Sequence, residues 1–346
     1  MSVVASAVES KPPEVAIATA AATAAPRQSL LISGLSLAAI GFMVAAYFVP
    51  LWWVSLTAPN YPPDAFPDGI RILFGFTGVT NGCTTVPKTS RLSKETQQED
   101  LGWRGDEGAI DEKFAANAKP EAALDCMHEM NTINHYVGMH PIGAGAPAER
   151  LLAKYIFGVL GVGLLAFAFA SKKVRLAILG VGYAAVSAWM VVGLWVTGGL
   201  AAHVTQYTTE TGQYFRDADR IVKWGHNLEL AVTISAVGLI VIMVALTLAT
   251  AKWEKAQLLL GVLPALLPVF FVGTFGAWLY FFGHNLHPWG AFTVKPFMPT
   301  VFGEGKVAQF STFSYPMPGF ALLVAASVLL LLAVLRRRLE LLDGSK

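Results

Sequence analysis

The sequence predicts an all-α integral membrane protein of six transmembrane helices, with a periplasmic cap formed by the long loop between the first and second helices. Hydrophobic residues make up 54% of the 346 residues and charged residues only 14%, with a mean hydropathy of +0.53. A soluble domain carries about 25% charged residues. Besides this composition, the sequence contains six long apolar runs, and each run is continuous. The net charge of +2 is too small to indicate a nucleic-acid partner.

The apolar runs are close to the length of about 20 residues that a helix needs to cross a bilayer. They cover residues 30–53, 155–170, 176–202, 230–250, 258–283 and 320–335. Strands of a membrane barrel are instead segments of about ten residues with alternating polarity, so a barrel is excluded. Pro264 and Pro268 predict a kink in the fifth run. A kink there could open a small pocket between helices for a lipid or quinone tail.

Short loops rich in Lys and Arg prefer the cytoplasm. Here they fall at residues 171–175, 252–255 and 336–338, which all lie on one side of six spans. We therefore expect an inner-membrane protein of bacteria with both termini in the cytoplasm. The expected organisation is a disordered cytoplasmic tail (1–28), a first transmembrane helix (29–54), a periplasmic loop or cap (55–150), a five-helix membrane domain with two shorter periplasmic loops (151–336), and a cytoplasmic tail (337–346).

Cys83 and Cys126 are the only cysteines, and both fall in the predicted cap. Two thiols on the oxidising side of a membrane usually form a disulfide. Closing a loop of about 40 residues would contribute about 3–4 kcal/mol by chain entropy. Metal ligation by the two sulfur atoms is the alternative.

A stretch dense in metal-capable side chains ends the predicted cap, at residues 126–140. Imidazole together with soft sulfur is the ligand set that copper prefers. The candidate copper ligands are His128, Met130, His135, Met139 and His140.

A second candidate cluster follows from the ends of the spans, since His203, His226, His284 and His287 are all expected at one depth near the outer surface. His284 and His287 would share a helix face if the fifth span continued that far, although Pro288 indicates a helix end. The alternative is that these histidines are interfacial residues bonded to the backbone or to lipid headgroups.

Other features narrow the classes of function. Aromatic residues at the span ends are typical of a membrane-interface belt; they are Trp52, Trp53, Trp224, Trp278, Tyr280 and Trp289. No ionisable residue lies well inside an expected span, which disfavours a transporter. The chain has no Walker loop, no Gly-x-Ser-x-Gly and no His-Glu-x-x-His. We therefore expect a protein that is not catalytic alone, although it could be a subunit of an oxidoreductase.

Two stretches resemble the signatures of a known family. "PLWWVSLTAPNYPPDAFPDGI" follows the first span, and "INHYVGMHPI" precedes the second. They resemble the "PLW.I.L.APQYPEGL" and "LNHYIGM" signatures of multi-span bacterial membrane proteins encoded beside nitrous-oxide reductase and related copper enzymes. The matching positions are Trp52, Leu56, Ala58, Pro59, Tyr61, Pro62, Gly69, Asn134, His135, Tyr136, Gly138 and Met139. This chain departs from the pattern by inserting residues 63–68 and by carrying the two cysteines.

The resemblance implies a setting of copper-dependent respiration. With the ligand-rich stretch, it leads us to expect a membrane accessory protein or subunit of a copper-dependent respiratory or oxidative enzyme, which binds or passes copper at the periplasmic face. Its partners would be membrane lipids and the other membrane subunits of that enzyme. The alternative is a metal-free, quinol-facing structural anchor subunit of a membrane complex. An enzyme with its own copper centre at the second histidine cluster ranks last, because only an assumed depth supports it.

Overall fold

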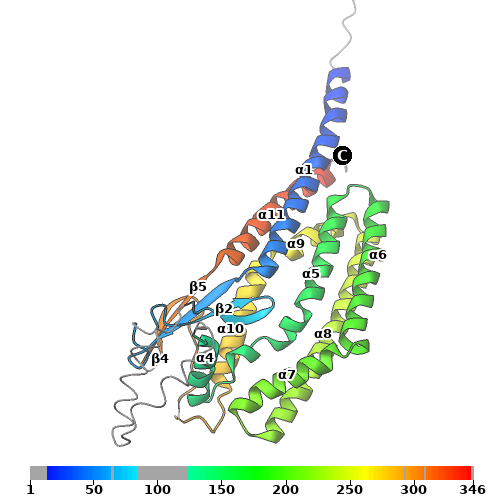
Figure 1. The fold of residues 1–346 in the computed structure, drawn as a ribbon. Helices are drawn as coiled ribbons and strands as arrows, with labels where there is room; N and C mark the ends of the chain where they lie inside the picture. Colours follow the sequence, from blue (N-terminus) through cyan, green and yellow to red (C-terminus); the bar gives the residue numbers. More distant parts are fainter. Residues whose placement is uncertain (1–13, 64–65, 85–123, 292–293, 308, 344–346) are drawn as a thin grey trace, which may run out of the picture.

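Six helices in the described part of the chain are long and apolar enough to cross a membrane, as predicted. The computed structural model describes residues 14–63, 66–84, 124–291, 294–307 and 309–343 (Figure 1). The N-terminal end of α1 and the C-terminal end of α11 lie at the same end of the bundle, as an even number of spans requires. The spans are Leu30–Phe48, Pro147–Ala168, Lys172–Val196, Ala218–Lys252, Leu267–His284 and Pro318–Asp343.

The helices extend beyond several of the expected boundaries. α1 (Glu14–Phe48) begins within the expected disordered tail, of which residues 1–13 lie outside the described residues. α11 (Pro318–Asp343) continues past the apolar run that predicted it. Four helices follow before the fifth apolar run: α5 (Pro147–Ala168), α6 (Lys172–Val191) with the π-helical turn η2 (Val192–Val196), α7 (Gly199–Tyr214) and α8 (Ala218–Lys252).

The fifth apolar run is broken where the prolines predicted a kink. A short 3-10 turn, η3 (Glu254–Leu258), leads into α9 (Leu259–Ala265), and α10 (Leu267–His284) begins after Leu266. Pro268 lies in the first turn of α10. Because proline has no N–H to donate and its ring collides with the preceding turn, the helix cannot run on through this point.

A five-stranded antiparallel sheet lies at the end of the bundle opposite the termini (Figure 1), which the all-α prediction did not include. Its strand order is β3-β2-β1-β5-β4, so the first and last outer segments of the chain build one sheet. The strands are β1 (Trp52–Thr57), β2 (Ile70–Gly75), β3 (Gly78–Asn81), β4 (Gly303–Val307) and β5 (Phe310–Pro316).

The central strand β1 explains the aromatic segment that follows the first span. Trp52 pairs with Phe74 of β2 on one side and with Pro316 of β5 on the other. Its indole is buried against Phe275 of α10 and packs edge-on to Phe320 of α11. Trp52 therefore joins the sheet to the bundle, and the expectation that it belongs to an interfacial aromatic belt was wrong.

The cap consists of β1–β5, α4 (Cys126–Tyr136) and the 3-10 turn η1 (Ile142–Ala144). α4 covers the sheet, and Met130 and Ile133 of the helix are buried with Ile70 and Ile72 of β2. Cys83 and Cys126 belong to the same cluster. The location of this cap in the periplasm stays a prediction.

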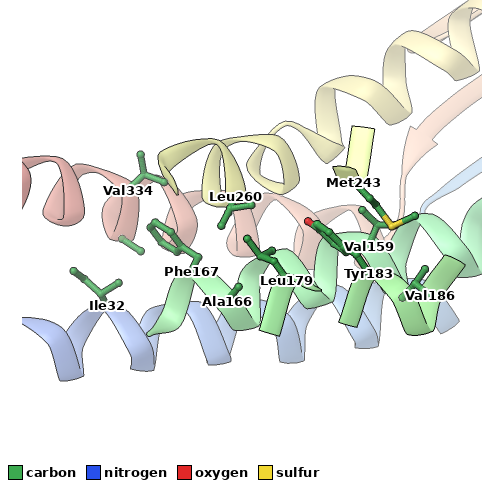
Figure 2. Close-up of a cluster of buried hydrophobic side chains, with 11 residues drawn as sticks. Ile32, Val159, Ala166, Phe167, Leu179, Tyr183, Val186, Met243, Leu260 and Val334 are labelled. Carbon is green, nitrogen blue, oxygen red and sulfur yellow. The ribbon is translucent and has the colours of Figure 1, made fainter. Parts of the chain in front are cut away.

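The bundle core is filled by side chains from α1, α5, α6, α8, α9 and α11 (Figure 2). Phe167 of α5 is fully buried between Ile32 of α1 and Val334 of α11. Leu179 and Tyr183 of α6 and Leu260 of α9 belong to the same cluster. This packing fixes α5 at the centre of the helices that position the site.

Candidate functional site

Cys83 and Cys126 form a disulfide, with Cα atoms 5.9 Å apart. The Asn81 side chain organises the junction: its amide nitrogen donates to the Leu124 carbonyl at 2.7 Å, and its Oδ1 accepts from the backbone N–H groups of both cysteines. Neither sulfur is a free ligand. The disulfide ties the start of α4 to the end of β3.

The five candidate copper ligands of the cap do not share one place. His128 is exposed, on the first turn of α4, whereas Met130 is buried beside the disulfide. Met139 is buried in the segment after α4. Only His135 and His140 come together, through ring contacts with Phe215. The structure therefore does not bring the five predicted residues together.

A histidine cluster does form around Phe215, which lies between α7 and α8. The ring centroids of His135, His140 and His287 lie 5.1, 5.8 and 4.4 Å from that of Phe215. His287 thus joins two histidines of the cap stretch, which links the two predicted clusters through one member. The Phe215 ring stacks on His287 and meets His135 and His140 at steeper angles.

Hydrogen bonds fix His287 in this cluster. Its backbone N–H donates to the Gly138 carbonyl at 2.6 Å, and its Nδ1 accepts from the Trp289 N–H at 3.1 Å. Its Nε2 lies 3.5 Å from Oδ2 of Asp217. Because Nδ1 is an acceptor, the ring proton of a neutral His287 is on Nε2, facing the carboxylate.

Burial favours the neutral imidazole at two members of this cluster, His140 and His287. Burial, with smaller contributions from the charges of Arg220 and His287, lowers the pKa of His140 from 6.5 to about 4. Burial also lowers the pKa of His287, against the opposing effect of Asp217. Nδ1 of His135 and both ring nitrogens of His140 are buried without a hydrogen-bond partner in the described part of the chain.

The other three span-end histidines stay apart from the cluster. Nε2 of His203 lies 2.8 Å from the Pro147 carbonyl, and burial lowers the pKa of this imidazole. His226 is exposed on α8. His284 is exposed, with its Nδ1 2.9 Å from the Tyr280 carbonyl. Among the described residues, no group of three or more His, Cys, Asp or Glu could hold a metal ion.

An apolar cavity of about 450 Å³ lies between α5, α8, α9, α10 and the β2–β3 hairpin. It borders α5 from Glu149 to Gly163 and α10 from Leu267 to Phe282. At 1.5 Å per residue it runs roughly 20 Å along both helices. Ligand pockets usually measure about 300–1,000 Å³. The shape and the apolar walls suit a hydrocarbon or isoprenoid chain.

The apolar cavity reaches the outer surface of the bundle at α8 and α10. Ile242 of α8 and Phe270 of α10 both line it, and they are 50% and 53% exposed. A lipid-soluble molecule could therefore enter sideways from the bilayer without crossing water.

The β2–β3 hairpin of the cap forms part of the wall of the apolar cavity. At the tip of the β2–β3 hairpin, Phe76 packs against Phe157 of α5 and Phe271 of α10, with ring centroids 4.7 and 6.1 Å away. Closer to the cap end of both helices, Nε1 of Trp278 donates to Oε1 of Glu149 at 2.9 Å. Trp278 lines the cavity, whereas the sequence predicted only a place in an aromatic belt.

A polar cavity of about 530 Å³ lies beside the apolar one, between the β2–β3 hairpin, α4, α5 and α7. Arg150 lines both cavities. Its Nη1 donates to the Gly143 carbonyl at 2.5 Å. Lys154 and Glu210 are the other charged residues of the polar cavity.

Glu149 and Arg150 were not identified as candidate site residues from the sequence. The available signal was a carboxylate followed directly by a guanidinium at the start of an apolar run. Nothing in the local pattern indicated that Trp278, 129 residues later, would bond to the carboxylate.

No protein-family model matches the chain, and no curated protein and no solved structure is significantly similar to it.

Proposed function

We propose that this chain is a metal-free membrane anchor protein that holds one long-chain amphiphile between its helices. The observation that carries the proposal is the apolar cavity along α5 and α10, whose charged lining residues, Glu149 and Arg150, both lie at the cap end. Such a site matches a molecule with a long apolar tail and a polar head at the membrane interface.

Retention of this molecule depends on its head and on the fit of its tail. Lipid tails are as apolar as the cavity wall, so moving a tail from bilayer to cavity gives little hydrophobic driving force. Specific binding must come from close packing and from polar groups at the cap end. The Glu149–Trp278 pair and Arg150 supply these groups.

A quinone, the class expected from the sequence, and a phospholipid both have this amphiphilic form. As an anchor subunit facing the quinol pool, the chain would hold its ligand within the bilayer and offer the cap to partner subunits. The exposure of the cavity lining at α8 and α10 supports exchange with the membrane.

Filling the cavity tests the proposal. Ala153 is 5% exposed and lines the cavity on α5, so Ala153→Phe places a ring where the tail would lie. Ala185→Phe is the matched control, because Ala185 is exposed on α6 and does not line the cavity. The purified proteins are washed free of loose lipid and their organic extracts are quantified by mass spectrometry.

We expect a stoichiometric amphiphile in the wild type and in Ala185→Phe, and its loss in Ala153→Phe. Retention of the same molecule in Ala153→Phe, or no retained molecule in the wild type, would contradict the proposal.

Copper handling, which the resemblance implies, is a separate proposal. Its support is the resemblance together with the unpaired ring nitrogens of His135 and His140 beside His287. The lack of any metal-holding group among the described residues stands against it.

A copper titration of the detergent-purified protein tests this second function. If the chain handles copper at this cluster, the triple variant His135→Ala, His140→Ala, His287→Ala should lose bound copper. The control His128→Ala, at an exposed position, should bind copper as the wild type does. Equal copper binding by the triple variant and the wild type would remove the copper function.

A further inference from the structure

Two charged side chains of the polar cavity have buried atoms without a hydrogen-bond partner in the described part of the chain. They are Nη2 of Arg150 and Oε2 of Glu210. Each side chain has one polar atom engaged, since Nη1 of Arg150 donates to Gly143 and Oε1 of Glu210 accepts from Gln206 at 2.7 Å. Both residues are half-buried, but these two atoms are inaccessible to solvent. Buried charged atoms are normally paired, so each free atom calls for a ligand group of opposite charge.

The two groups are not paired with each other. Among the described residues, no ion pair joins Arg150 to Glu210 within 4.0 Å. Their charges nevertheless act on each other and on His203, which lies in the same cavity. The space between them is therefore a polar chamber with a cation at one wall and a carboxylate at another.

Their order along the site is fixed by the two cavities. Arg150 borders the apolar cavity as well as the polar one, whereas Glu210, on α7, lines only the polar cavity. A ligand whose tail lies along α5 meets the Arg150 guanidinium, beside the Glu149 carboxylate that Trp278 bonds, and then the Glu210 carboxylate farther on. Its head must carry an anion next to the tail and a cation beyond it.

The charges of the whole site favour a head without net charge. Arg150 and Lys154 supply two positive charges, and Glu149 and Glu210 supply two negative charges. A singly anionic head would leave Glu210 unpaired and would be repelled by both carboxylates. A neutral quinone head would leave the guanidinium without an anion.

We propose that the two cavities together bind one phospholipid with a phosphoethanolamine head. This inference rests on the proposed function and names its ligand class. One acyl chain lies in the apolar cavity, and the second reaches the bilayer between α8 and α10. The phosphate binds Arg150, whose planar guanidinium suits phosphate oxygens, and the primary ammonium donates to Glu210.

The hairpin beside Arg150 is shaped for this arrangement. Gly78 has φ +131°, and a Cβ there would lie 2.8 Å from Cδ of Arg150. Only glycine lets the arginine stem lie across the hairpin backbone, between the two cavities. Nη1 of Arg150 is bonded to the Gly143 carbonyl, whereas Nη2 has no partner in the described part of the chain.

Lipid competition on the full-length protein tests the proposal. The purified chain, washed free of lipid, is offered phosphatidylethanolamine, phosphatidylglycerol, phosphatidylcholine or a long-chain ubiquinone in equal amounts, and the bound molecules are counted by native mass spectrometry. We expect phosphatidylethanolamine to be retained about tenfold more than the other lipids, as one charge-assisted hydrogen bond would produce. A trimethylammonium head lacks the N–H donors that Glu210 requires.

Substitution of the carboxylate gives the decisive comparison. Glu210→Gln keeps the size of the side chain and should remove most of the preference for phosphatidylethanolamine over phosphatidylglycerol. Glu229→Gln makes the same change at an exposed position outside both cavities and should leave the preference intact. Arg150→Gln should weaken all three phospholipids, and Arg150→Lys should restore part of their binding.

The failure of this inference can be told apart from failure of the proposed function. Preferential binding of ubiquinone or phosphatidylglycerol, or an unchanged preference in Glu210→Gln, overturns the phosphoethanolamine site. If the retained molecule is still lost in Ala153→Phe, the amphiphile-binding function stands. If that variant retains every lipid as the wild type does, both proposals fall.

Discussion

The indole Nε1 of Trp52 donates a 2.8 Å hydrogen bond to Oγ of Ser314, although 262 residues separate them in the chain. Both residues are buried, with exposed fractions of 3% and 0%. The Ser314 hydroxyl in turn donates to the Val301 carbonyl at 2.8 Å. One hydroxyl therefore links the central strand β1, its neighbour β5 and the segment that leads into β4.

Removing this hydroxyl should destabilise the cap. Ser314→Ala leaves the buried indole N–H and the half-buried Val301 carbonyl without their partner, and an unsatisfied buried group costs about 1–3 kcal/mol. Thermal unfolding of the detergent-solubilised protein measures the loss. Ser311→Ala, on the half-buried part of the same strand, is the control, and an equal change in both variants would contradict the role given to Ser314.

Gly138 should tolerate alanine much less well than Gly198. Both have positive φ, +80° and +72°, so alanine strains each backbone by about 1–2 kcal/mol. A Cβ on Gly138 would also lie 2.5 Å from the His287 carbonyl oxygen, whereas a Cβ on Gly198 meets nothing within 4 Å. Unfolding temperatures should fall further for Gly138→Ala, and equal shifts would show that the contact with His287 is loose.

Acidification should destabilise the cap through His140. Its pKa is 6.5 when exposed and about 4 in the folded protein, so between these values only the unfolded chain takes up the proton. The stability from neutral His140 is complete above pH 6.5 and is lost as the pH falls toward 4, by about 3 kcal/mol in all.

Comparison with His140→Asn isolates this contribution from the carboxylates that titrate in the same range. The wild type should lose more stability than the variant between pH 7 and pH 4.5, measured by thermal unfolding. Parallel pH profiles would show that His140 is not the group responsible.

Breaking the disulfide should loosen the cap but not the membrane bundle. Cys83 and Cys126 are 43 residues apart, and closing a loop of that size contributes about 3–4 kcal/mol. In the double variant Cys83→Ser, Cys126→Ser, limited proteolysis should cut the cap faster while circular dichroism shows the same helix content. A reducing agent should have the same effect on the wild type and none on the variant; unchanged proteolysis would refute the prediction.

The six spans could be predicted because each is a local property of the chain. A helix satisfies its backbone hydrogen bonds within its own segment, so a continuous apolar run predicts a span without reference to the other runs. The sheet could not be predicted in this way. β1 and β5 pair although almost the whole membrane domain separates them in the sequence. The aromatic run at Trp52 is equally typical of a strand and of an aromatic belt at the membrane interface.

The histidines show how far an argument from depth can go. Span ends place residues at one level of the membrane but do not fix their direction around each helix. His226 faces outward from α8, and His203 lies near the Pro147 carbonyl. α10 ends at His284, so the chain beyond it turns toward the cap and brings His287 to Gly138.

The position of β1 between β2 and β5 also sets an order of events during biogenesis. Its pairing edge for β5 stays open until residues 310–316 have been synthesised, after all but the last span. Until then the nascent protein exposes an unpaired strand that other chains could join. Formation of the β4–β5 hairpin is therefore the step that protects the nascent chain from misassembly.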